Sequence, residues 1–151
     1  MNEIVNYLID HKITISTMES CTGGLLASLI TDVSGASQIL KFSAVTYSTE
    51  YKIKMGVSEE VINKYSVYSK ETAREMAYNI SKFSNSDIGV GITGRLASNI
   101  QEEKSVDICI YDKINDRYYY VYKLLEKNNR YDNKLEVIEE FIKLFNSTFI
   151  T

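Results

Sequence analysis

The hydrophobic positions of this chain repeat with the period of a helix in some segments and with the two-residue period of a strand in others. Each change of period marks the start of a new element. A helical period predicts helices at residues 2–9, 25–33, 58–65, 70–83 and 135–145. Period-two alternation and short apolar runs predict strands at residues 13–18, 41–47, 88–93, 106–111 and 118–125. Ser58, Ser69 and Asp132 are the expected N-caps of the last three helices.

The order of these elements predicts the fold class. A helix–strand alternation favours parallel pairing in the first part of the chain, whereas residues 112–116 are predicted to form a hairpin turn that makes the end antiparallel. We therefore expect an α/β protein, a three-layer α/β/α sandwich with a mixed sheet. The 151 residues, 44% of them hydrophobic, suffice for one domain spanning residues 1–151.

The composition limits the kinds of partner and the cell compartment that we expect for this protein. The chain has a net charge of -3 and a pI near 5.3, which argues against a nucleic-acid partner. It contains no long apolar run and no signal-peptide pattern at its start, so we expect no membrane partner and a cytoplasmic location. The two cysteines, Cys21 and Cys109, fit a reducing compartment, with Cys109 in the core.

Several common kinds of site are improbable from the residues. His11 is the only histidine and lies in a predicted turn, which disfavours a Ser-His-Asp triad or a histidine metal cluster. Neither the Walker A pattern nor GxGxxG occurs, so the standard phosphate-binding loops are missing. Any reaction must therefore use other side chains.

The segment Ser20-Cys21-Thr22-Gly23-Gly24 follows the first predicted strand and opens a helix. Ligands of open α/β sheets gather at the carboxyl ends of strands, and a helix N-terminus favours an anion or a developing oxyanion. This pattern indicates a binding or catalytic corner. A serine or threonine cap on a helix that needs a tight entry turn explains it equally well.

A second candidate segment, residues 45–52, begins at the end of the second strand and contains Tyr47 and Lys52. If the two strands are neighbours, both side chains can reach the rim that carries Ser20. A lysine base must have its pKa lowered from about 10.4 to about 7 or 8 by burial or nearby cations. Taken alone, Lys52 is more typical of a solvated helix start than of a base, and Glu19 or Glu50 would raise its pKa if close.

Six segments come in a recognisable order: ESCTGG, Gly35-Ala36-Ser37, VTYSTEYK, Met55-Gly56-Val57, VYSKETA and DIGVGITG. With these motifs the chain resembles the CinA C-terminal domain family, the nicotinamide-nucleotide amidohydrolases. The resemblance implies hydrolysis of the carboxamide of nicotinamide mononucleotide to nicotinate mononucleotide and ammonia, a step of pyridine nucleotide salvage. It further implies a small-molecule nucleotide substrate, no metal or cofactor, and self-association as a homo-oligomer.

The resemblance also implies roles for particular residues. Ser20 matches the nucleophile, and Lys52 and Tyr47 match its base and proton relay. The residues that we expect to contact the substrate are Glu19, Cys21, Thr22, Gly23, Gly24, Thr93, Gly94 and Arg95.

One segment departs from the family pattern. After Thr93-Gly94 the family continues I-A-G-P and later K-P-V-G, whereas this chain reads RLASNIQEEKSVD and keeps only Lys104 and Val106. Leu96 and Ile100 cannot tolerate positive φ as glycine does. Arg95 either grips a phosphate or fills the pocket. The alternative function is a catalytically impaired nucleotide-binding or interaction protein.

Two further features of the sequence, Cys21 and the tyrosine-rich residues 117–122, each suggest an additional interpretation. Cys21 is a rival nucleophile, since a helix N-terminus lowers a thiol pKa. The tyrosine-rich residues 117–122 indicate an edge strand or a subunit contact rather than a base-stacking surface.

Overall fold

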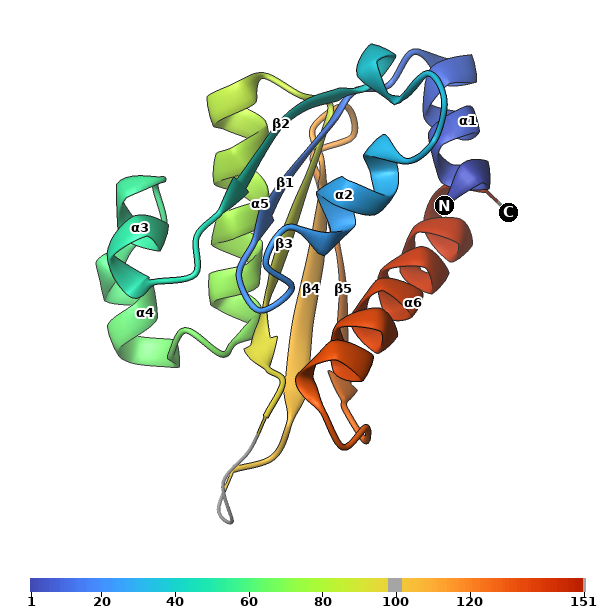
Figure 1. Ribbon diagram of the computed structural model, residues 1–151. Helices are drawn as coiled ribbons and strands as arrows, with labels where there is room; N and C mark the ends of the chain where they lie inside the picture. Colours follow the sequence, from blue (N-terminus) through green and yellow to red (C-terminus); the bar gives the residue numbers. More distant parts are fainter. Residues whose placement is uncertain (98–101, 151) are drawn as a thin grey trace.

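A mixed five-stranded sheet forms the centre of the molecule (Figure 1). The computed structural model describes residues 1–97 and 102–150. The strands lie in the order β2-β1-β3-β4-β5, with β1 parallel to β2 and β3, and with β4 antiparallel to both β3 and β5. Their bounds are β1 Ile15–Glu19, β2 Leu40–Val45, β3 Ile88–Arg95, β4 Ser105–Asp112 and β5 Arg117–Leu124.

Helices cover both faces of this sheet, which makes the three layers (Figure 1). One face carries α1 (Asn2–His11), α2 (Leu25–Thr31) and α6 (Arg130–Phe149), and the other carries α3 (Thr49–Lys54), α4 (Glu59–Tyr65) and α5 (Lys70–Ser84). A one-turn helix, η1 (Ala36–Gln38), precedes β2. No helix within the described residues is both long enough and apolar enough to cross a membrane.

Helix α5 lies unusually close to β3 because two strand positions have no side chain. A Cβ atom at Gly91 would stand 2.3 Å from the carbonyl oxygen of Ala73, and one at Gly89 would stand 2.0 Å from that of Ala77. Only glycine permits this approach. The packing anchors the central strand, at whose carboxyl end Thr93 and Gly94 lie.

The structure confirms the predicted fold class and corrects two local predictions. Residues 49–54 form a helix, α3, that the periodicity did not predict because one and a half turns cannot show a stripe. The N-cap of α6 is Asn129 rather than Asp132. Its side chain accepts the Asp132 N–H at 2.8 Å, so Asp132 occupies the first turn.

Candidate active site

The turn after β1 is built on a buried carboxylate. Glu19 is fully buried, and its oxygens accept hydrogen bonds from Thr22 Oγ1 at 2.6 Å, from Leu26 N–H at 2.9 Å and from Ala27 N–H at 3.0 Å. The N-cap of α2, Gly24, supplies no side chain, so Glu19 takes the capping role from five residues away. Glu19 thus lies beneath the turn and positions it.

Helix α3 carries Lys52 into the interior beside this turn. Ser48 caps the helix by accepting the Tyr51 N–H at 3.2 Å. Lys52 is 3% exposed, and its Nζ atom donates hydrogen bonds to the Thr46 carbonyl oxygen at 2.8 Å and to Ser20 Oγ at 2.9 Å. The structure therefore brings Ser20 and Lys52 together from two segments 32 residues apart.

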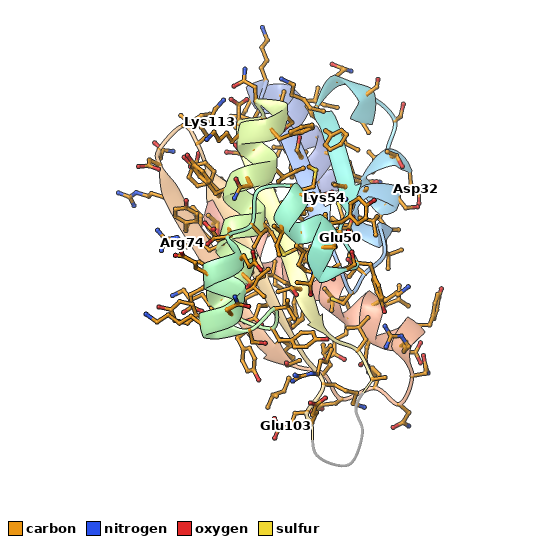
Figure 2. All side chains as sticks on the ribbon, turned by 90° about the vertical axis from the view of Figure 1, so that its left-hand side faces the viewer. Asp32, Glu50, Lys54, Arg74, Glu103 and Lys113 are labelled. Carbon is orange, nitrogen blue, oxygen red and sulfur yellow. The ribbon has the colours of Figure 1, made fainter. Side chains whose placement is uncertain are left out.

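Burial lowers the pKa of the Lys52 amine below its ordinary value, because the charged form loses its hydration. The two acidic side chains that would oppose this shift point elsewhere. Glu19 accepts a hydrogen bond from the Leu26 N–H at the start of α2. Glu50 forms an exposed ion pair with Lys54 at 3.5 Å on the outer side of α3 (Figure 2). The environment of Lys52 thus favours the neutral amine, the form that can accept a proton.

Ser20 and Lys52 open onto a cleft of about 230 Å³ at the carboxyl end of the parallel strands. The cleft is bordered by the β1–α2 turn, the start of α3, the α4–α5 connection, the end of β3 and the start of α6. Its lining residues are Ser20, Cys21, Tyr47, Thr49, Lys52, Val67, Tyr68, Gly94, Arg95, Leu96, Ala97, Glu102 and Arg130.

Tyr47 lies at the rim of the cleft rather than beside the amine. Its side chain is 62% exposed, and its hydroxyl accepts a hydrogen bond from Arg130 Nη2 at 2.9 Å. The described hydrogen bonds of Lys52 do not include Tyr47. The relay role expected for Tyr47 therefore stays a prediction.

The segment that departs from the family pattern forms one wall of the cleft. Thr93 is buried and donates its hydroxyl to the Val67 carbonyl at 2.8 Å, whereas Gly94 and Arg95 line the cleft directly. Leu96 is 1% exposed and belongs to the core, without positive φ. The expectation for Ile100 lies outside the described residues.

The glycine turn itself faces a neighbouring depression of about 290 Å³. Gly23 and Gly24 adopt φ of 62° and 96°, values that favour glycine, and border this depression with Thr22, Tyr131 and Lys134. Of the residues expected to contact the substrate, Cys21, Gly94 and Arg95 line the first hollow, and Thr22, Gly23 and Gly24 line the second. Glu19 and Thr93 are buried and line neither hollow.

The rival nucleophile, Cys21, has the wrong ionisation state. Burial, with the nearby Glu19 carboxylate, raises the pKa of its thiol to about 12. The backbone N–H of Cys21 and the basic groups of Lys52 and Arg130 act in the opposite direction but do not offset burial, and Glu19 already occupies the Leu26 and Ala27 N–H groups. Cys21 remains a protonated thiol at neutral pH, which is a poor nucleophile. Cys109 is buried in β4, as expected.

Comparison with known proteins now places the chain in a family. The family model of the CinA C-terminal domain matches residues 1–149. The chain belongs to the CinA C-terminal domain family. This membership supports a CinA-like function for the chain.

The relatives of this CinA domain are longer proteins. It is 41% identical over 133 residues to a protein of Thermoanaerobacter pseudethanolicus named as competence-damage inducible; the match covers 86% of this chain and 32% of that protein. It is 48% identical over 92 residues to the CinA-like protein of Kosmotoga olearia, which covers 60% of this chain and 22% of that protein. The chain thus spans a third or less of the length of these relatives.

Solved structures share the fold of the CinA domain. The competence/damage inducible protein CihA from Agrobacterium tumefaciens superposes with a TM-score of 0.86 at 26% identity, covering 94% of this chain and 91% of that one. A CinA superfamily protein from Enterobacter cloacae gives a TM-score of 0.90 at 20% identity, covering 97% and 88%.

Tyr68 and Glu102 are among the cleft residues of the CinA domain that the sequence did not indicate. Tyr68 lies in the quoted segment VYSKETA, but nothing in its spacing marks it as a site residue. Glu102 lies within the altered segment RLASNIQEEKSVD, and only the folded chain brings it to the cleft. The Thr46 carbonyl that accepts from Lys52 could not be found, since backbone acceptors carry no sequence signal.

Proposed function

We propose that this CinA domain hydrolyses the carboxamide of nicotinamide mononucleotide to nicotinate mononucleotide and ammonia. The observation that carries the proposal is the 2.9 Å contact between a buried lysine amine, Lys52 Nζ, and Ser20 Oγ at an open cleft. A hydroxyl beside a neutral amine is an activated nucleophile of the kind that forms acyl-enzymes.

The reaction would proceed in two halves. The Ser20 oxygen attacks the amide carbon while its proton moves to Lys52 Nζ, and the resulting ammonium then protonates the departing nitrogen, which leaves as ammonia. The nicotinate ester on Ser20 remains. Water, losing a proton to Lys52, attacks this ester and releases the carboxylate, and the proton returns to Ser20.

The oxyanion of each tetrahedral intermediate needs a donor near Ser20. Two N–H groups of the turn are occupied, since Gly23 donates to the Ser20 carbonyl at 3.0 Å and Leu25 donates to that of Thr22 at 3.1 Å. The N–H groups of Cys21, Thr22 and Gly24 donate to no other described residue, and of these three residues Cys21 is the one that lines the cleft with Ser20. We assign the Cys21 N–H as the principal oxyanion donor.

Substitution of the two reacting side chains tests the proposal. We expect Ser20→Ala to abolish ammonia release from nicotinamide mononucleotide, and Lys52→Met and Lys52→Arg each to lower kcat by about 10²–10⁴-fold. Arginine keeps a donor and a charge but cannot deprotonate, so equal loss in both variants identifies a base. The rate of the wild type should rise with pH through a pKa below the ordinary lysine value.

Lys54→Met is the matched control, because Lys54 lies on the outer side of the same helix and is exposed. It should retain wild-type kinetics. Loss of activity only in Cys21→Ala would reverse the assignment of the nucleophile. Tight nucleotide binding by the wild type without any ammonia release would favour the alternative, a binding protein that has lost turnover.

A further inference from the structure

Arg95 is held in the cleft by two contacts. Its guanidinium lies over the ring of Tyr68, 4.1 Å from the centroid, and its Nε is 3.3 Å from Glu102 Oε2. The carboxylate of Glu102 thus already pairs with the guanidinium group, which is the group with which arginine binds phosphate and carboxylate.

The charges of the cleft suit an anionic ligand, apart from the carboxylate of Glu102. Among its described lining residues, Lys52, Arg95 and Arg130 are basic, and Glu102 is the single carboxylate. Even without Lys52, the two guanidinium groups of Arg95 and Arg130 outnumber the one carboxylate. Glu102 therefore takes, on Arg95, the place that a ligand anion would otherwise have.

The Arg95–Glu102 pair is easily broken. The two side chains are 30% and 48% exposed, and pairs of this kind are weak because water competes for both partners. A phosphate dianion brings more charge and a better geometric match to the guanidinium than one carboxylate does. The cleft of about 230 Å³ is also below the range typical of small-molecule sites, about 300–1,000 Å³, so a ligand needs the space beside Arg95.

We infer that Arg95 recognises the phosphate of a phosphorylated substrate, and that Glu102 is a built-in competitor that this phosphate displaces. Tyr68 keeps the guanidinium in place during the exchange, so no reordering of Arg95 is required. The inference rests on the proposed function for the identity of the substrate, nicotinamide mononucleotide. Its consequence is selection against unphosphorylated compounds, which cannot displace Glu102.

Binding measurements by calorimetry or NMR titration test this assignment, with ribose 5-phosphate and nicotinamide mononucleotide as phosphorylated probes and ribose as the neutral control. Loss of a charge-assisted contact predicts that Arg95→Met weakens binding of both phosphorylated probes about tenfold or more. Removal of the competing charge predicts that Glu102→Gln tightens it about two- to fivefold. Ribose binding should be insensitive to either change.

Two matched variants control for general effects of charge. Glu103→Gln alters the exposed neighbour of Glu102, at the lower end of the molecule in Figure 2 and outside the cleft lining, and Arg117→Met alters an exposed arginine on β5. Both should leave the affinities at the wild-type value, and thermal unfolding should show that Arg95→Met is folded. Unchanged affinity in Arg95→Met, weaker binding in Glu102→Gln, or no binding of either phosphorylated probe by the wild type would overturn the inference.

The inference and the proposed function fail separately. The predicted pattern of phosphate affinities without any ammonia release would leave the role of Arg95 standing and remove the reaction. Ammonia release with identical phosphate affinities in all variants would keep the reaction and remove the role of Arg95.

Discussion

At the scale of single residues, the buried position of Lys52 is the feature that matters most. Its amine sits 2.8 Å from the Thr46 carbonyl and 2.9 Å from Ser20, and it is 3% exposed. Taken alone, the residue favoured a solvated lysine, because a helix of six residues has no clear inner face. Neighbouring strands allowed Lys52 to reach the rim that carries Ser20, the family resemblance implied their pairing, and the structure supplies its geometry.

The lowered pKa of Lys52 has a consequence for stability. Between the folded pKa and the ordinary value of 10.5, the unfolded chain binds more protons than the folded chain, so this residue makes the free energy of unfolding increase with pH. Below the folded pKa the cost of burying the charge is present in full. Lys52→Met removes that cost. We expect the unfolding free energy of the wild type minus that of Lys52→Met to rise between pH 7 and pH 10, measured by urea denaturation.

The same difference taken with Lys54→Met should be independent of pH, because this side chain is 57% exposed in the folded protein. Other titrating groups are common to all three proteins and cancel in the differences. A flat difference for Lys52→Met as well would show that the folded protein leaves the Lys52 amine hydrated, and the base assignment would lose its physical basis.

At the scale of elements, the β1–α2 turn depends on Glu19. Its carboxylate satisfies the Thr22 hydroxyl and the Leu26 and Ala27 N–H groups, all within one buried pocket of the turn. Glu19→Ala leaves these donors without a partner. We expect the unfolding free energy to fall by about 3 kcal/mol and ammonia release to fall with it, since Ser20 precedes the same turn.

Glu50→Ala is the matched control for Glu19→Ala. Glu50 is 67% exposed and pairs only with Lys54, so its removal should change stability by less than about 1 kcal/mol. Equal stability of the two variants in urea denaturation would mean that α2 does not need its buried cap. In that case the turn would have to be held by Gly23 and Gly24 alone.

The elements that the sequence predicted are those with long or strongly periodic patterns. Residues 70–84 follow Ser69 and carry a clear apolar stripe, and the alternation at residues 118–124 indicates a strand that proves to lie at the sheet edge. Helix α3 was not predicted because it is too short. Asn129 was passed over for Asp132 because both are good caps and only the backbone decides between them.

At the scale of the whole molecule, the topology explains how distant segments form one site. The parallel strands β1, β2 and β3 run in the same direction, so their carboxyl ends lie at the same edge of the sheet (Figure 1). Ser20, Lys52 and Arg95 line one cleft at this edge. The alternation of elements predicted this three-layer arrangement. It did not predict that Thr22, Gly23 and Gly24 border a different hollow from Cys21, because the sequence does not show toward which side of a turn each residue faces.

The central claim is that Ser20, activated by the neutral amine of Lys52, becomes acylated. Intact-protein mass spectrometry after acid quenching of a reaction with nicotinamide mononucleotide, followed by peptide mapping, tests this directly. We predict a nicotinate-ester adduct on the peptide that contains Ser20 in the wild type, and no adduct in Ser20→Ala or Lys52→Met. An adduct mapped to Cys21, or ammonia release that persists in Ser20→Ala, would contradict the account.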